Sequence, residues 1–290
     1  MSERDEVWRK IERFLKVRAL IPVLGPGVIT FGEDDRPLYP WLADRVAERL
    51  GVKAKESTMH AVVCAHLREG GELEDVSIEV DELFDSTDIQ PGPLLLALAE
   101  VVQCRTFVTL GFDPLFERAL QRVRGGSRSA TRVWVFSLDR AAEDLPILGE
   151  GQSVIAYLFG KAAPNPGFHL WSADAVELVW QLHRQLPALS NLGRTLSENN
   201  LLVLGTRFSD WLMHFLLRAV RQKPLTEGVG KKFLLAEGDQ AMAREAVAFY
   251  ESLGQGIEFL EVDPLGFTRQ FVDRARALEA PVVPGARGSV

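Results

Sequence analysis

The sequence contains little cysteine, no long hydrophobic run and no excess of basic residues. Two cysteines, Cys64 and Cys104, are too few for a disulfide framework or a four-cysteine zinc site, and they favour a reducing, cytoplasmic compartment. The longest apolar stretch, residues 93–102, includes Glu100 and is far shorter than the roughly 20 residues of a membrane span. The N-terminus carries charge from its third residue, unlike a signal peptide. These absences predict a soluble protein without a membrane span.

The charge balance argues against a nucleic-acid partner. The chain has 33 basic and 40 acidic residues, a net charge of −7, whereas phosphate binding depends on clustered Lys and Arg. His60 and His66 are six positions apart, which is not the spacing of a metal-binding helix, and we expect no metal site. With 290 residues, 47% of them hydrophobic and 25% charged, the chain is an ordinary globular protein of two domains or one large α/β domain.

Short apolar runs alternate with helical patterns along most of the chain. Strands are predicted at residues 19–24, 105–110, 132–137, 153–159, 201–204, 232–236 and 257–262, and helices at 5–17, 40–50, 93–103, 113–123, 172–186, 209–222, 239–253 and 267–278. Ser172 is a plausible N-cap for its helix. Because no two-residue hairpin signals separate the strands, the pattern predicts a doubly wound, mainly parallel (Rossmann-like) sheet of about six strands.

One region interrupts the alternation. Residues 56–88 have helical periodicity and an acidic stretch but no convincing strand. We therefore expect a helical insertion subdomain at 52–103 within a Rossmann-like domain formed by residues 1–51 and 104–280. Residues 281–290 are rich in Pro and Gly and are typical of a linker or tail.

Ligands of such sheets bind outside the carboxyl ends of the strands, so the candidate site residues are those that follow the strands. Gly25 and Gly27 allow tight turning and free N–H groups for a phosphate, although Pro26 has none and Thr30 replaces the third glycine of the usual dinucleotide pattern. An ordinary strand-to-helix turn is the alternative at this position, and capping of the next helix is the alternative at Asp113. The predicted binding residues are Gly25, Pro26, Gly27, Val28, Thr109, Gly111, Asp113, Gly160, Gly205, Thr206, Ser209 and Asp210.

Five segments, in this order, resemble a known family. They are LGPGV at 24–28, YPWL at 39–42, TLGFDPLFE at 109–117, YLFGK at 157–161 and LLVLGTRFSDWL at 201–212. Together they are similar to the divergent sirtuin-like (SIR2-like) NAD-binding domain of bacterial antiphage defence proteins, which is also found beside TIR domains. The resemblance covers residues 18–222 and extends more faintly to 280. It implies NAD or a related ADP-ribose nucleotide as cofactor, a TIR or other effector as partner, and homo-oligomers.

The sequence departs from this family where the chemistry takes place. The hydrolytic relatives carry an asparagine at the position of Gly111, where it helps to position the nicotinamide ribose and a water. They carry a histidine general base where this chain has Tyr157 or Phe159. A phenylalanine cannot act as a base, and a tyrosine, with a pKa of about 10, is a poor one. The resemblance therefore implies a nucleotide pocket from which the usual catalytic residues are missing.

Three functions stay open at this point. The first, which we favour, is a sensor or regulatory module that binds the nucleotide without efficient NAD hydrolysis. The second is an active NAD glycohydrolase (NADase) with a rearranged site, for which Tyr157 and Asp113 are the catalytic candidates and Glu117 a further one. The third is an oligomerisation scaffold that has lost the ligand.

Overall fold

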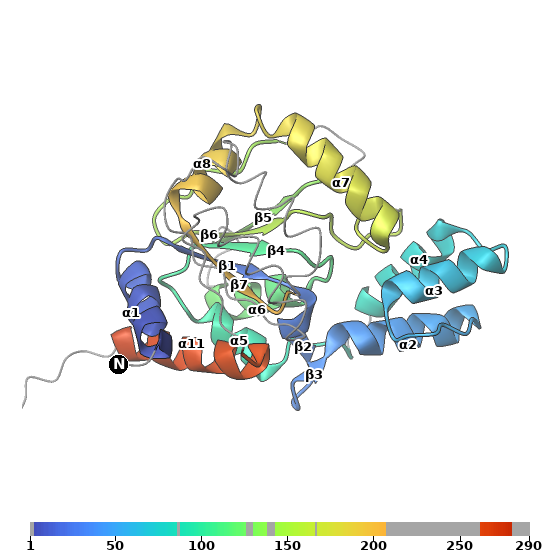
Figure 1. Ribbon diagram of the computed structural model, residues 1–290, viewed down its shortest axis with the longest axis horizontal. Coiled ribbons are helices and arrows are strands. Elements are labelled where there is room, and N and C mark those ends of the chain that lie inside the picture. Colours follow the sequence, from blue (N-terminus) through green and yellow to red (C-terminus); the bar gives the residue numbers. More distant parts are fainter. Residues whose placement is uncertain are drawn as a thin grey trace, which may run out of the picture.

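A five-stranded parallel sheet forms the centre of the molecule. The computed structural model describes residues 3–85, 88–125, 130–137, 143–165, 167–206 and 262–279 (Figure 1). The strands are β1 (Leu20–Leu24), β4 (Thr106–Thr109), β5 (Thr131–Val135), β6 (Ser153–Tyr157) and β7 (Asn200–Leu204). Their order in the sheet is β5-β6-β4-β1-β7, and every pair is parallel. The predicted mainly parallel, Rossmann-like sheet is confirmed; the strands predicted at 232–236 and 257–262 lie outside the described residues.

Helices cover both faces of this sheet (Figure 1). One face carries α1 (Glu3–Lys16), α5 (Pro93–Ala99), α6 (Leu115–Arg124) and α11 (Pro264–Glu279), and the other carries α7 (Ser172–Gln185) and α8 (Ser190–Glu198). Successive strand side chains point to opposite faces, so Leu24 and Leu202 pack with the first group while Val23 and Val203 pack with the second. This two-sided burial explains why β1, β6 and β7 are largely apolar, whereas the edge strand β5 is partly exposed and includes Arg132.

Two details on the second face differ from the prediction. Helix α8 was not predicted at all. Ser172 does not cap α7 but is its first residue. The capping acceptor is Asp174, whose carboxylate receives the Leu170 N–H at 3.0 Å and the Trp171 N–H at 3.3 Å. A carboxylate in the first turn serves this purpose well, because it also faces the positive end of the helix dipole.

Three helices form a lobe beside the sheet: α2 (Leu38–Leu50), α3 (Met59–Arg68) and α4 (Leu73–Asp85) (Figure 1). Helix α5, which was expected within the insertion, instead packs on α6 and α11, and α2, which was expected with the sheet, packs on α3 and α4. A 3₁₀ turn, η1 (Pro26–Val28), and a small antiparallel pair, β2 (Thr30–Phe31) and β3 (Arg36–Pro37), connect β1 to this lobe. That pair was not predicted.

Aromatic packing fixes the lobe to the sheet at the end of β4. The ring of Phe112 lies 5.3 Å from Tyr39 of α2, 6.4 Å from Phe84 of α4 and 5.0 Å from Phe168, centroid to centroid. Such pairs add roughly 0.5–1.5 kcal/mol each beyond the area that they bury. The first turn of α2 is therefore held directly over the carboxyl edge of the sheet.

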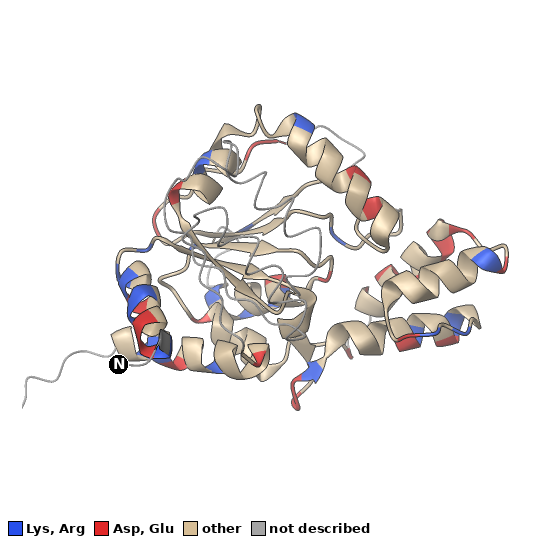
Figure 2. Cartoon of the chain, in the orientation of Figure 1, with Lys and Arg blue, Asp and Glu red and all other residues tan. Residues whose placement is uncertain are grey.

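Charged side chains lie mainly on the helices and connecting loops, whereas the central strands are almost free of them (Figure 2). Acidic and basic residues alternate along α1 and at the far end of the lobe, so neither region has a single sign of charge (Figure 2). None of the helices in the described ranges has the length and apolar composition needed to cross a bilayer.

Candidate functional site

The strand order places a switch point between β1 and β7. From β1 the chain continues to β4 and then to β5 and β6 on one side, and it returns to β7 on the opposite side of β1. All five strands run in the same direction, so their carboxyl ends share one edge. A crevice outside that edge, at the switch point, is where ligands bind in open α/β sheets.

The glycine turn after β1 is bonded to the end of β7. The Gly25 N–H donates to the Leu204 carbonyl and the Gly27 N–H to the Gly205 carbonyl, each at 2.8 Å. The N–H groups of Val28 and Ile29 donate within the turn at a longer 3.3 Å. The turn therefore offers an anion no unpaired amide, and only the two longer bonds are readily exchanged.

Close packing, rather than open space, is what requires glycine here. A Cβ on Gly25 would lie 2.0 Å from the Thr206 hydroxyl oxygen. Gly205 has a φ of +67°, and its Cβ would lie 2.5 Å from the Val28 nitrogen. The predicted residues of β1 and β7 are thus brought together, and protein atoms already lie within 2.5 Å of the positions that Cβ atoms on Gly25 and Gly205 would take.

Thr206 stands out in this group. It is 6% exposed, and within the part of the chain that the structure describes its hydroxyl has no hydrogen-bond partner. An unsatisfied buried hydroxyl costs about 1–3 kcal/mol. It is the buried side-chain oxygen without a hydrogen-bond partner among the described residues at the switch point.

A second group of predicted residues lies at the end of β4, the neighbour of β1. The Tyr39 hydroxyl donates to Asp113 Oδ2 at 2.9 Å and accepts the Phe112 N–H at 3.1 Å. Asp113 Oδ1 accepts the N–H of Leu115, the first residue of α6, at 3.0 Å. The N-cap position itself is Pro114 and not Asp113, so the prediction was wrong by one residue. Burial raises the pKa of Asp113 to about 6, although the Tyr39 and Leu115 bonds oppose the rise. The same tyrosine occupies the space beside Gly111, because a Cβ on this glycine would lie 2.2 Å from the Tyr39 hydroxyl.

Tyr157 at the end of β6 joins this group. Its fully buried hydroxyl lies 3.1 Å from the Asp113 carbonyl oxygen and 3.2 Å from Glu117 Oε2. Burial, and next the negative charge of Glu117, raise the pKa of Tyr157 well above its usual value. The phenol therefore keeps its proton at neutral pH and acts here as a hydrogen-bond donor.

The remaining predicted residues have local roles or lie outside the description. Thr109 is buried, and its hydroxyl accepts the Gly111 N–H at 3.1 Å. Gly160, with a φ of +79°, packs on the Phe168 backbone, where a Cβ would lie 2.5 Å from Cα. Ser209 and Asp210 fall outside the described residues.

Sequence reasoning gave no role to Tyr39 or Lys161, although both occur in the segments quoted for the resemblance. Tyr39 reaches Asp113 across 74 positions, and Lys161 Nζ lies 2.6 Å from Glu117 Oε2. His169 also lies near the end of β6, since its N–H donates to the Phe159 carbonyl at 2.9 Å. Burial lowers the pKa of its imidazole to about 4, so the ring is neutral at pH 7. No sequence motif signals these contacts.

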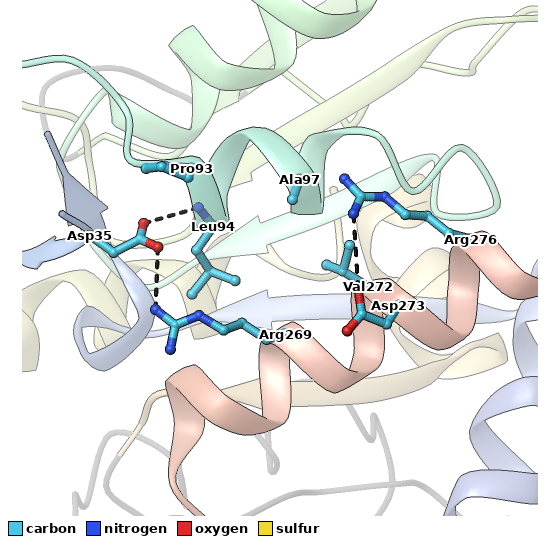
Figure 3. Close-up of a pocket in the computed structure, with 8 residues that line it drawn as sticks. All are labelled: Asp35, Pro93, Leu94, Ala97, Arg269, Val272, Asp273 and Arg276. Carbon is cyan, nitrogen blue, oxygen red and sulfur yellow. Dashed lines mark hydrogen bonds and ion pairs between the residues drawn. The ribbon is translucent and has the colours of Figure 1, made fainter. Parts of the chain in front are cut away.

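A pocket of about 240 Å³ lies between α5 and α11 and contains none of the predicted residues (Figure 3). Apolar side chains of both helices line it, and Arg269 and Arg276 stand at its sides (Figure 3). Arg269 pairs with Asp35 at 3.3 Å, and Arg276 with Glu100 at 2.5 Å. Both cations are thus neutralised by the protein. No group of three or more metal-ligating side chains occurs among the described residues.

A doubly wound sheet with polar groups at its switch point is an arrangement typical of nucleotide-binding α/β domains. The family model of the SIR2-like domain matches residues 105–254, just over half of the chain, and the protein belongs to that family. The match includes Asp113, Tyr157 and Thr206 but not the glycine turn. A crystal structure of a Sir2 homolog in complex with NAD aligns with 92% of this chain and 94% of its own, at 15% identity and a TM-score of 0.41. No curated protein sequence matches the chain.

Proposed function

We propose that this SIR2-like domain binds NAD or a related ADP-ribose nucleotide at the carboxyl edge of the sheet, between β1 and β7, and acts as a sensor or regulatory module. The observation that carries the proposal is the buried, unpartnered hydroxyl of Thr206 against Gly25 at the switch point. A ribose hydroxyl or phosphate oxygen is the kind of group that would satisfy it, because a threonine hydroxyl both donates and accepts.

Both groups of residues described above, one at the ends of β1 and β7 and one at the end of β4, would hold the nucleotide. Thr206 and the exchangeable amides of Val28 and Ile29 would serve the part of the ligand at β1 and β7. Asp113 would serve the part over β4, because its carboxylate has acceptor capacity beyond the bonds from Tyr39 and Leu115. NAD, when bound, would supply the glycosidic bond to nicotinamide, and these protein groups would orient its ribose.

Thr206→Val tests this role directly. The unliganded variant should be more stable than the wild type by about 1 kcal/mol, because an unsatisfied hydroxyl is removed. Its affinity for NAD and ADP-ribose should fall about tenfold, which equals about 1.4 kcal/mol. Urea denaturation measures the first effect and titration calorimetry the second.

Thr131→Val provides the matched control. The Thr131 hydroxyl lies 3.2 Å from that of Ser153, at the opposite, amino ends of β5 and β6. This variant should lose stability and keep its nucleotide affinity. A Thr206→Val protein that is destabilised and binds nucleotides as the wild type does would contradict the proposal.

We further infer that the chain alone hydrolyses NAD inefficiently. Gly111 offers no side-chain amide, Phe159 no base, and the phenol of Tyr157 stays protonated. Loss of a general base removes about 10²–10⁴-fold in rate. Purified protein at several concentrations should therefore release nicotinamide from NAD at a rate near that of a blank.

An active NAD glycohydrolase is the second candidate, and one observation favours it. Asp113, with a pKa of about 6, is ionised at pH 7 yet basic enough to accept a proton. Robust nicotinamide release that disappears in Asp113→Ala or Tyr157→Phe would establish this alternative. A ligand-free scaffold, the third candidate, predicts no nucleotide binding at all.

The wider setting is proposed on the family resemblance. It comprises a role in bacterial antiphage defence, a TIR or other effector as partner, and a homo-oligomeric state. Measurement of the oligomeric state with and without nucleotide would show whether ligand binding is transmitted to assembly.

A further inference from the structure

Lys161 lies beside the end of β4 although it follows β6 in the chain. The Ala162 N–H donates to the Phe112 carbonyl at 2.9 Å, so the segment after β6 crosses over the neighbouring strand end. Adjacent strands are about 4.8 Å apart, and β1 with its glycine turn is the next strand along. Lys161 therefore lies nearer to β1 than its place after β6 alone would put it.

Lys161 connects the buried pair of Glu117 and Tyr157 to solvent. Its side chain is 30% exposed, whereas that of its partner Glu117 is 11% exposed and Tyr157 is fully buried. The ammonium group also lies 5.7 Å from the centre of the Tyr157 ring. The cation therefore sits at the boundary between the cluster and the edge of the sheet.

The Glu117 carboxylate has hydrogen-bond donors other than Lys161. The Tyr157 hydroxyl lies 3.2 Å from Oε2, and the Gln121 amide donates to Oε1 at 3.0 Å. When Lys161 turns away, the carboxylate keeps these two neutral donors. The carboxylate then loses its counter-charge but keeps hydrogen bonds, which lowers the cost of breaking the pair.

The described segments that directly follow the strands offer no other available cation. The described residues that directly follow β1, β4, β6 and β7 (25–29, 110–118, 158–165 and 205–206) contain only Arg118 and Lys161 as cations. Arg118 donates to the carbonyl oxygens of Ile89 and Phe84 at 3.2 and 2.5 Å, which fixes its guanidinium on the backbone. Of these two cations, Lys161 is therefore the side chain that can reorient.

We propose that Lys161 binds the phosphate of the nucleotide, leaving Glu117 to do so, and that it makes the site selective for phosphate-bearing nucleosides. This rests on the proposed function, because it assigns a residue to the same site. An ammonium on a flexible stem suits such an exchange of one anionic partner for another.

The test compares ADP-ribose with adenosine, which lacks phosphate, by titration calorimetry on the whole chain. In Lys161→Gln the affinity for ADP-ribose should fall at least tenfold, while that for adenosine stays as in the wild type. Lys161→Arg should retain most of the affinity for ADP-ribose. Lys53→Gln, on the exposed surface of the lobe, should change neither affinity and controls for net charge.

Glu117→Gln is the second variant, and it tests the exchange itself. It frees Lys161 from its ion pair but keeps an amide for Tyr157 and Gln121, so ADP-ribose should bind severalfold more tightly. Unchanged binding of ADP-ribose in both Lys161→Gln and Glu117→Gln would overturn the role of Lys161 while leaving nucleotide binding intact. A wild type that binds neither compound would overturn the proposed function, and this inference with it.

Discussion

Gly205→Ala is expected to lower the free energy of unfolding by about 3 kcal/mol and to abolish nucleotide binding. Two costs add: a left-handed backbone costs a non-glycine residue roughly 1–2 kcal/mol, and overpacking costs typically about 1–3 kcal/mol. The overpacking arises because the new Cβ would meet the Val28 nitrogen at 2.5 Å, which is backbone and cannot rotate away. The glycine turn would have to shift, and the Thr206 hydroxyl would shift with it.

Gly51→Ala separates these two costs. Gly51 ends α2 with a φ of +69°, almost the value of Gly205, yet a Cβ there would meet nothing within 4 Å. Its alanine variant should lose only about 1 kcal/mol and bind nucleotide normally. Equal losses in the two variants, measured by urea denaturation, would show that the contact between the ends of β1 and β7 is not tight.

Asp113 is expected to make the protein less stable as the pH rises from 4 to 7. Its pKa is about 6 in the folded protein because the carboxyl is buried, against the ordinary value of 3.8. Between pH 3.8 and pH 6 the folded protein holds a proton that the unfolded chain has released, so raising the pH favours unfolding. The full penalty, present above pH 6, is about 3 kcal/mol.

Asp113→Asn cannot ionise and should escape this penalty. The difference in unfolding free energy between wild type and variant, measured from pH 4 to pH 8, should therefore change by about 3 kcal/mol, in the direction that disfavours the wild type at high pH. Tyr39→Phe removes a donor that lowers the pKa of Asp113, so the pKa should rise and the loss of stability should continue to higher pH. A difference that is constant with pH would mean that the buried carboxyl titrates normally.

Much of the fold could be predicted because it depends on local pattern. The apolar run at 201–204 identified a buried strand, since both of its faces pack against helices. Helix α8 was missed because its sequence, with Gly193 and two serines, has only two apolar side chains, Leu192 and Leu196, which both pack in the core on this face of the sheet. The limits of the lobe could not be predicted either, because α2 and α5 are equally helical and differ only in the surfaces on which they pack.

By itself the sequence determined the alternation of strands and helices, the glycines at the strand ends and therefore the edge of the sheet where a ligand would bind. Hydrophobic periodicity and glycine content are properties of the chain itself, and they can be read without knowing any contact. The tertiary structure decided which of these residues meet. Tyr39 with Asp113, Lys161 with Glu117 and Thr206 with Gly25 are pairs joined across 44 to 181 positions, and no local pattern encodes them. It also determined why glycine is required at Gly25, Gly111 and Gly205, because the nearest atom that a Cβ would meet at each of them belongs to a residue far away in the sequence.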